Sequence, residues 1–596
     1  MRLSITNSKN NKCYMIIKDY TTSDGKRTTK VYETLGNQSK IEERFGKVDT
    51  LNKVKDYINK LNKDLKDNKE LPVYHKFDPN KRIEKNIRRK FNIGYLFLKD
   101  IYYSLNLDKM CEHISKKYNF EFDLNEILEC LIYSRILWPS SKLSTYNQSE
   151  KFIEKLKLEY HQILRSLDYL NKENDYIQKC LFDNSNTITN RNYKVIYYDC
   201  TNFYFYTEEN EFQRYGISKQ HQPLPLVQMG LFMDANGLPF AMNVNPGNTS
   251  EAKTMIPSEE KFLKQYNMEG KNIIVCTDAA MCNDDIKKFN VKDGRGFVIT
   301  QSIKASSKDI KTFALDKSGW RILGDINTLY NLDDVQKSMD DNKKEENIYY
   351  NKIFYKEIEC ETKSVKQTLI ITFSFKYRDY QNKLKEHQFE RAKLLVNEVN
   401  KKNKNATKKD DVEEIKISKN QNDPKRFIKL IKTTETGEVA KYSQYEVNEE
   451  LLKEEKQFNG LYGISTNLIN ETETIVKVIN GRWEIEESFR IMKEEFDSNN
   501  VYLSLEDRIR AHFLICYLAL FEYRFLEQKL NNKYTVYEII DTLRDMNMLE
   551  TKGDGYIPDY TRTDLTDDLH RIFGLNTDNE IITYKKMKEI LKQIKK

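Results

Sequence analysis

The sequence predicts an α/β protein in which a mixed sheet flanked by helices is interrupted by a β-rich insertion. Short apolar segments of strand character alternate with helical segments between about residues 191 and 302. Their order, β-β-β-α-β-α-β, is typical of a mixed sheet with helices packed against it. A long, partly Lys-rich segment follows, and a strand and a helix resume the pattern from about residue 456. We expect a mainly helical N-terminal region before this core and a helical C-terminus after it.

These patterns divide the chain into six segments. Alternating apolar and polar residues around the turn Ser23–Lys26 predict a small β-hairpin unit at the N-terminus. Helical spacing with few glycines follows, and we interpret that segment as a DNA-binding region. The predicted segments are the hairpin unit (1–50), the helical region (51–190), the first part of the core (191–302), the β-rich and basic insertion (303–455), the second part of the core (456–530) and a helical C-terminal region (531–596).

Composition excludes several classes of protein. The longest apolar run, Phe513–Phe521, is far shorter than the roughly 18–20 residues of a membrane-spanning helix. The N-terminus lacks the apolar core of a signal peptide, so we expect a cytosolic protein with no membrane partner. Nine cysteines without a CxxC pair indicate neither a disulfide framework nor a structural zinc site.

The net charge of +7 conceals two basic stretches. Residues 51–90 hold 13 Lys and Arg against 6 Asp and Glu, and residues 401–434 hold 11 against 5. Two such stretches, hundreds of residues apart, fit a protein that touches an extended polyanion at several places. The alternative is an ordinary solvated surface, for which charge runs are common.

Two aspartates follow predicted strands of the core. Asp199 lies in the run Val195–Thr201, and Asp278 ends the run Asn272–Asp278. Functional groups gather where the strands of α/β sheets end, which makes both candidates for a site. The alternative is that each aspartate only caps the next turn.

A helix predicted over Ile475–Phe496 carries the third acid. At about 100° per residue, Arg482, Glu486 and Lys493 fall within an arc of roughly 40° beside an apolar stripe. Glu487 points about 100° away and is the weaker candidate. A plain Arg–Glu pair four residues apart on a solvated face is the alternative.

Three converging carboxylates repel one another and therefore need a cation. Carboxylate oxygens suit Mg²⁺ or Mn²⁺. Two such ions can generate a nucleophile from water and clamp the attacking and leaving oxygens of a phosphodiester. The basic residues Arg482 and Lys493, close to the third acid, would hold the negative strand beside the metals.

The helix motif resembles the Y-R-E-K signature of bacterial insertion-sequence DDE transposases. In that signature the four residues are separated by two, three and six others, which Arg482, Glu486 and Lys493 match in type and spacing. Ile479 stands at the tyrosine position. Upstream, the runs Tyr198–Thr201 and Cys276–Met281 are similar to the two aspartate strands of that family. The long gap before Glu486 also resembles the β-rich insertion found in this branch.

The resemblance implies an RNase H-like catalytic core with Asp199, Asp278 and Glu486 as its metal-binding triad. It implies two Mg²⁺ ions, with Mn²⁺ as a substitute, and double-stranded DNA as the partner. Family members cut transposon ends with metal-activated water and join the freed 3′-hydroxyls to target DNA. They act as multimers, usually homodimers on paired ends, and the expected location is the cytoplasm, at the nucleoid. The expected DNA contacts are Arg482, Lys493, Lys219 and Arg490.

Other functions stay open on the sequence alone. A metal-dependent nuclease or a degenerate relic of the same fold would cut without joining, and Ile479 favours this version. A DNA-binding protein without catalysis would rely on the two basic stretches, although the three acids are all present. A tyrosine recombinase would need a clustered Arg, His and Tyr constellation, which the sequence does not show.

Overall fold

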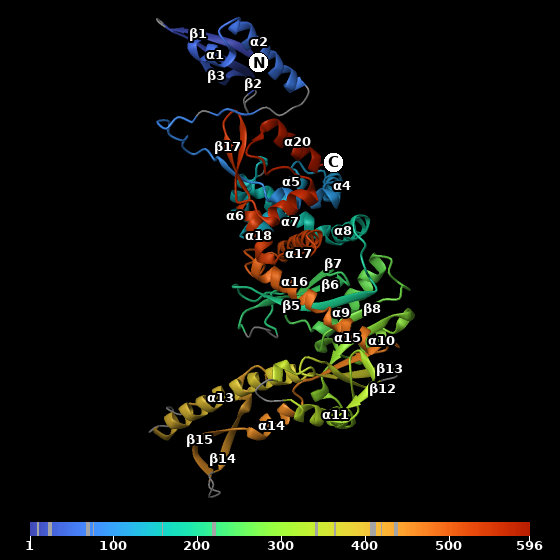
Figure 1. Ribbon diagram of the computed structural model, residues 1–596. Coiled ribbons are helices and arrows are strands. Elements are labelled where there is room, and N and C mark those ends of the chain that lie inside the picture. The colour runs from blue at the N-terminus through green and yellow to red at the C-terminus, as the bar shows by residue number, and fades with distance from the viewer. Residues whose placement is uncertain are drawn as a thin grey trace. The chain divides into compact units, whose positions relative to one another are not determined.

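The computed structural model describes most of the chain, and Figure 1 shows its elements. The described residues are 1–8, 11–21, 27–66, 72–75, 77–157, 159–216, 222–339, 344–362, 365–405, 413–418, 420–433 and 439–596. They form two compact units. One consists of Met1–Thr189 with Arg490–Lys596, and the other is Asn190–Phe489.

A ten-stranded mixed sheet is the centre of the second unit, with strand order β11-β10-β12-β13-β16-β9-β8-β5-β6-β7. Strands β5, β8 and β9 are mutually parallel, and the other neighbours are antiparallel. The bounds are β5 (Val195–Tyr204), β6 (Leu226–Asp234), β7 (Pro239–Pro246), β8 (Ile274–Thr277), β9 (Gly296–Gln301), β10 (Trp320–Ile322), β11 (Asp325–Tyr330), β12 (Phe354–Thr362), β13 (Val365–Phe373) and β16 (Leu461–Thr466).

Helices cover both faces of this sheet, which confirms the predicted mixed sheet flanked by helices. On one face, Phe262 of α9 packs on Phe232 of β6 with ring centroids 4.7 Å apart, and Phe232 stacks on Tyr198 of β5. Because neighbouring strand residues point to opposite faces, Tyr197 and Asp199 point to the other face. The helices of this unit outside residues 375–457 include α9 (Glu251–Gln265), α10 (Asp284–Phe289), α11 (Lys308–Leu315), α12 (Leu332–Lys337), α15 (Thr472–Asn480) and α16 (Trp483–Arg490).

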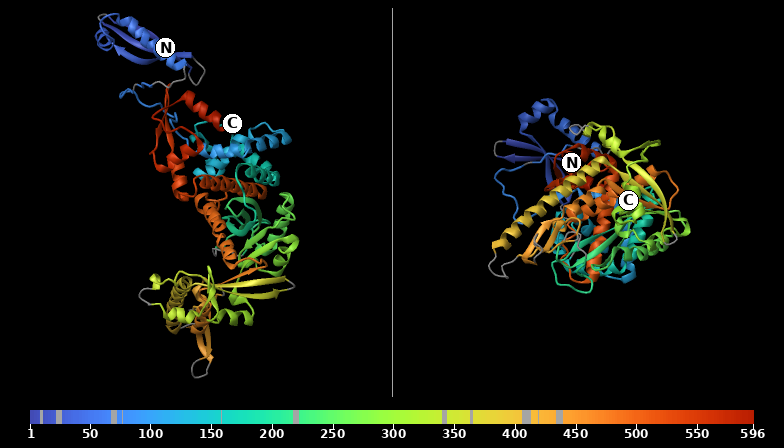
Figure 2. Two further views of the ribbon diagram at one scale, coloured as in Figure 1. Left: turned by 45° about the vertical axis from the view of Figure 1, so that its right-hand side comes forward. Right: turned by 90° about the horizontal axis from the view of Figure 1, so that it is seen from below.

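The predicted insertion, residues 303–455, differs from expectation in its first half. Strands β10 to β13 extend the main sheet, because β13 pairs with β16 from Thr368↔Thr466 to Phe373↔Leu461. Only the part that follows forms a separate lobe, which we call the α13 lobe (residues 375–457). Figure 1 shows its long helix beside a hairpin, and Figure 2 shows the same elements from two further directions. Its elements are α13 (Phe375–Asn405), the 3-10 turn η7 (Pro424–Phe427), β14 (Ile428–Thr433), β15 (Val439–Val447) and α14 (Glu449–Gln457).

The first unit is mainly helical and contains one long, largely buried helix, α17. Helix α17 is buried along most of its length, including the run Phe513–Phe521, as expected of a helix at the centre of a bundle. The unit contains α1 (Gln38–Phe45), α2 (Thr50–Lys66), α3 (Tyr95–Ser104), α4 (Leu107–Tyr118), α5 (Leu124–Leu137), α6 (Lys142–Gln148), α7 (Tyr160–Lys172), α8 (Asn174–Ile188), α17 (Glu506–Lys529), α18 (Val536–Asp545), α19 (Asp564–Phe573) and α20 (Tyr584–Ile594).

Both ends of the chain carry more strand than the sequence predicts. The N-terminal hairpin unit is a three-stranded antiparallel sheet of β1 (Arg2–Ser8), β2 (Asn11–Thr21) and β3 (Arg27–Gly36). The predicted turn Ser23–Lys26 lies outside the described residues. The C-terminal region is not purely helical, because its short strands form a sheet with Lys90–Asn92, which lie more than four hundred residues earlier in the sequence. The sheet there is made of β19 (Ile582–Thr583), β18 (Gly555–Asp559), β17 (Asn547–Thr551) and β4 (Lys90–Asn92).

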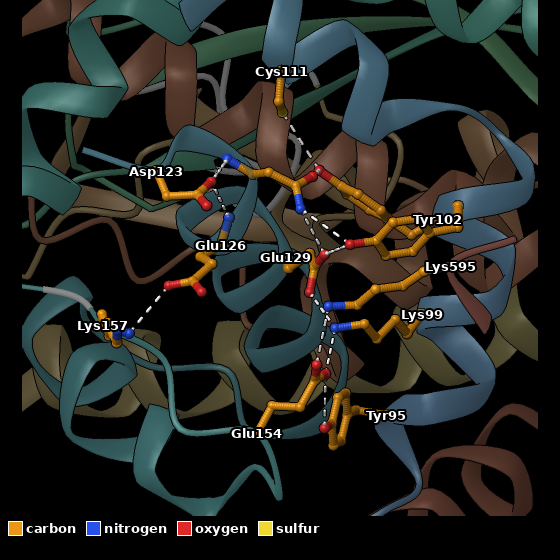
Figure 3. Close-up of polar contacts among 12 residues, drawn as sticks. Tyr95, Lys99, Tyr102, Cys111, Asp123, Glu126, Glu129, Glu154, Lys157 and Lys595 are labelled. Carbon is orange, nitrogen blue, oxygen red and sulfur yellow. Dashed lines mark hydrogen bonds and ion pairs between the residues drawn. The ribbon is translucent and has the colours of Figure 1, made fainter. Parts of the chain in front are cut away.

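A buried ionic network ties the first unit together (Figure 3). The ammonium of Lys99 on α3 lies 2.9 Å from Glu129 of α5 and also pairs with Glu154. Lys595 at the C-terminal end adds a contact of 3.2 Å to Glu154. Burial works to lower the pKa of Lys99, but the two carboxylates outweigh it and raise that pKa. The network therefore holds elements together that lie far apart in the sequence.

In the described part of the chain, no helix has both the length and the hydropathy to cross a bilayer.

Candidate active site

Asp199 lies within β5 rather than at its end, contrary to the sequence-based expectation. The strand continues to Tyr204 because it pairs with β6 along its whole length. On the opposite edge, however, the parallel ladder with β8 ends at Tyr197↔Cys276. Asp199 therefore lies two residues beyond this ladder, where the sheet opens. Its side chain is buried, and Oδ1 accepts a hydrogen bond of 2.7 Å from the N–H of Cys200.

Asp278 directly follows β8, as predicted, and begins a 3-10 turn over Ala279–Met281. Its Oδ1 accepts a hydrogen bond of 2.9 Å from the N–H of Ala280. The register Tyr197↔Cys276, continued by two residues, sets Asp278 level with Asp199 on the neighbouring strand. The two carboxylates therefore come from corresponding positions just beyond the end of this ladder.

The predicted helix Ile475–Phe496 is broken into three pieces. Helix α15 ends at Asn480, α16 begins at Trp483, and a π-helix follows over Ile491–Glu495. In a continuous α-helix, the carbonyl of Val478 would accept the N–H of Arg482. Here that N–H bonds to Ile479, and the Val478 carbonyl accepts the Tyr197 hydroxyl at 3.0 Å.

Gly481 permits this junction between α15 and α16. A Cβ at this position would lie 2.1 Å from the Tyr197 hydroxyl oxygen. The glycine therefore lets the helix junction rest directly on β5, two residues before Asp199. This contact fixes the position of Arg482 and of the start of α16, which carries Glu486, above the sheet.

Arg482 stands among the three predicted acids. Its Nη2 lies 3.8 Å from Asp199 Oδ2 and 3.5 Å from Glu486 Oε1. Burial works to lower the pKa of Arg482, but the negative charges of Asp199 and Asp278, with Cys276 and Tyr462, outweigh it and raise that pKa. The side chains of Arg482 and Asp199 are 12% and 11% exposed, whereas that of Glu486 is 63% exposed. The fold thus brings Asp199 and Glu486 to one guanidinium, and the charge of Asp278 also acts on it.

The other three predicted DNA contacts are Arg490, Lys493 and Lys219. Arg490 ends α16 and pairs with Glu494 at 2.9 Å. Lys493 lies in the π-helix, so the regular α-helical arc assumed for it does not apply. Both belong to the first unit, whereas the acids belong to the second. Lys219 falls in residues 217–221, outside the described residues.

The sequence reasoning missed three residues that build the site. Tyr197 and Gly481 form the junction described above, and Tyr462 of β16 faces Arg482 from the sheet. The Tyr462 hydroxyl lies 2.7 Å from Thr300 Oγ1. Burial raises the pKa of Tyr462, and the hydrogen bond with Thr300 and the positive charge of Arg482 oppose that rise. The sequence could have identified Tyr197, because side chains two residues apart in a strand point to the same face of the sheet and Asp199 is two residues after Tyr197.

The cluster fits a divalent metal by the chemistry of its donors. Three carboxylates supply the hard oxygen ligands that Mg²⁺ and Mn²⁺ prefer. Within the described ranges, no three His, Cys, Asp or Glu side chains are arranged closely enough to hold a metal ion. In this conformation Asp199 and Glu486 share the Arg482 guanidinium as their cation, and the side chain of Glu486 is largely exposed.

Residues 190–521, more than half of the chain, match the family model described as transposase DDE domain. No curated protein sequence matches significantly. Among solved structures, a cryo-EM structure of the piggyBac transposase synaptic complex with hairpin DNA is similar at 9% identity and a TM-score of 0.33, over 84% of each chain. A crystal structure of the Mos1 mariner paired end complex with Mn is similar at 11% identity and a TM-score of 0.12, over 42% of this chain and 68% of that chain. Both structural similarities are too low to bear on function.

Proposed function

Because the chain belongs to the transposase DDE domain family, we propose that it is a DNA transposase of the bacterial insertion-sequence type. Asp199, Asp278 and Glu486 are its catalytic, metal-binding triad, on an RNase H-like core built around β5 to β9 and α16. The observation that supports this proposal is that Arg482 contacts both Asp199 and Glu486 and also feels the charge of Asp278, although these acids come from segments as much as about two hundred residues apart.

The three carboxylates would hold two Mg²⁺ ions, with Mn²⁺ as a substitute. Bound there, the ions would activate water and stabilise the leaving oxygen of a phosphodiester. The chain's own part is positional: two strands and one helix hold the ligands, and the Tyr197–Gly481 junction sets the helix. Arg482 balances the acids in this conformation and is free to turn to a DNA phosphate once another cation takes its place.

The reaction proposed is cleavage at the terminal inverted repeats followed by transesterification. Water cuts the strand and leaves a 3′-hydroxyl, which then attacks a phosphodiester of target DNA. Lys493, Arg490 and Lys219, with Arg482, would contact the DNA backbone, assisted by the helical region 51–190. We propose that two copies act on paired ends, in the cytoplasm at the nucleoid.

A metal-dependent nuclease, or an inactive DNA-binding descendant, is the second candidate. Ile479 at the signature tyrosine position favours it. An assay with labelled transposon ends, target DNA and Mg²⁺ separates the possibilities. Joined products support the transposase, and cleavage without joining supports the nuclease. A mobility shift without cleavage in either Mg²⁺ or Mn²⁺ would leave only the DNA-binding protein. The DNA flanking the gene supplies the end sequences, because imperfect inverted repeats are expected there.

A further inference from the structure

The α13 lobe holds a buried carboxylate that faces three cations. Glu455 of α14 is 5% exposed in its side chain and lies 3.0 Å from Arg426 of η7. Its other oxygen lies 2.6 Å from the ammonium of Lys304, which follows β9. Lys385 of α13 approaches to 3.7 Å. Glu455 therefore links three elements of the lobe to the end of a core strand.

The charges of this cluster do not balance. In the part of the chain that the structure describes, no second carboxylate pairs with Lys304, Lys385 or Arg426. One negative charge against three positive charges leaves a surplus of two. Burial, together with the neighbouring cations, lowers the pKa of Lys385 to about 8. Such a surplus in a partly buried place attracts an anion from outside.

Two of the cations can reach an anion from solvent. The side chains of Lys304 and Lys385 are 35% and 20% exposed. Lys304 uses one donor on Glu455, while Lys385 donates to the Glu455 carbonyl and to Asn459. Each ammonium has three donors, so both retain capacity for a further acceptor. Arg426 is held rigidly behind them over the ring of Phe427, and its buried Nε has no partner among the described residues.

We propose that Lys304, Lys385 and Arg426 bind a backbone phosphate of double-stranded DNA at the base of the α13 lobe. The proposal rests on the proposed function for the identity of the DNA. A phosphate oxygen complements an ammonium pair beside a guanidinium, and Glu455 keeps the three cations together when DNA is absent. The site also gives a role to the basic stretch 401–434, which includes Arg426 and which the acid cluster leaves unexplained.

The main test measures how DNA affinity depends on salt for the full chain. Lys385→Gln and Lys304→Gln should each lower the salt slope by about 1 on any duplex, since one phosphate contact is lost. Lys402→Gln is the matched control. It removes a lysine of the same helix α13 whose charge is already balanced by Glu398 and Glu413, both at 3.0 Å. Unchanged slopes in both test variants, or an equal loss in Lys402→Gln, would overturn the proposal.

A second measurement separates anion binding from a purely structural cluster. Inorganic phosphate should raise the Tm of the wild-type protein above that in chloride of equal ionic strength. Glu455→Gln removes the competing internal anion and should enlarge this phosphate shift, even if its basal Tm falls. A cluster that only holds the lobe in place predicts a lower Tm with no phosphate shift. Should Glu455→Gln not fold, loss of the shift in Lys385→Gln decides the same question.

The outcomes also separate this site from the proposed function. A phosphate shift with unchanged DNA slopes would mean a site for free phosphate and would refute the DNA assignment. A protein that joins DNA ends but shows neither effect would keep the transposase proposal and remove this one. A protein that neither cuts nor joins DNA, yet loses salt slope in Lys385→Gln, would keep the phosphate site and remove the transposase proposal.

Discussion

Gly481→Ala should destabilise the protein, although a generic helix argument predicts the reverse. The backbone there has φ −64° and ψ −11°, which alanine adopts freely, and alanine favours helix over glycine by about 1 kcal/mol. The added Cβ, however, would lie 2.1 Å from the Tyr197 hydroxyl oxygen and must move about 1.3 Å to reach ordinary contact at 3.4 Å. Overpacking costs about 1–3 kcal/mol and the lost Tyr197–Val478 hydrogen bond about 0.5–1.5 kcal/mol.

The two costs sum to about 1.5–4.5 kcal/mol, and the helix gain of about 1 kcal/mol leaves an expected net loss of about 0.5–3.5 kcal/mol in the free energy of unfolding, measured by urea denaturation. Because the junction sets the position of Glu486, single-turnover cleavage should fall by about a hundredfold per folded molecule. DNA affinity should change little. A variant as stable as the wild type would contradict the packing argument.

A double-mutant cycle isolates the cause. Tyr197→Phe removes the hydroxyl and keeps the ring, whose Cζ lies 2.9 Å from the added Cβ. Gly481→Ala should therefore cost about 1–2 kcal/mol less in that background. Tyr198→Phe is the matched control, since its hydroxyl lies 3.3 Å from Thr254 on the opposite face of the sheet. Additive effects of Gly481→Ala with Tyr197→Phe would refute the reasoning.

Four further predictions follow from named contacts. Glu486→Gln should abolish DNA cleavage and leave binding measurable by mobility shift; activity retained there but lost in Glu487→Gln would show that the wrong carboxylate was chosen. Lys493→Ala should weaken end binding or joining more than folding, as compared by joining assays and thermal melts. Arg482→Gln should tighten Mn²⁺ binding roughly tenfold or more in calorimetric titration, because a charge 3.5–3.8 Å from two carboxylates no longer competes. Glu522→Gln should raise the Tm at pH 8 more than at pH 5.

The last prediction depends on the sign of one pKa shift. Glu522 is fully buried, both carboxyl oxygens lack a partner among the described residues, and burial raises its pKa well above the ordinary value of 4.5. The folded state therefore binds a proton that the unfolded state releases. Stability is lost as the pH rises from the ordinary pKa toward the folded one, by about 1.4 kcal/mol per pH unit. Equal Tm gains at pH 5 and pH 8 would contradict this assignment.

The strands and the acids could be found from the sequence because both leave local marks. Continuous apolar runs predicted β5, β6, β8 and β9, since strands covered on both faces are apolar throughout. Asp278 was placed correctly because β8 stops pairing with both of its neighbouring strands just before this residue. Asp199 was not, because β5 ends on one edge and continues on the other, and a single run of residues does not show this difference.

The insertion shows the same limit. Thr368–Phe373 was recognised as strand-like, but its pairing partner Leu461–Thr466 lies about ninety residues away. Pairing of this kind depends on which edge of the sheet is free. The ion pairs around Glu455 could not be predicted from the sequence either, since the three cations come from three separate segments.

The sequence by itself determined the residue types of the site, the apolar strands that carry two of them and the helix motif that carries the third. Tertiary structure alone decided that the motif helix breaks at Gly481 and that Arg482 turns inward to the acids. The physical reason is that a prediction from periodicity takes no account of the elements that pack against a helix. This helix contacts the Tyr197 hydroxyl of β5. That hydroxyl bonds to the Val478 carbonyl, which accepts the N–H of Gly481 but not that of Arg482, and so the helix turns at this point.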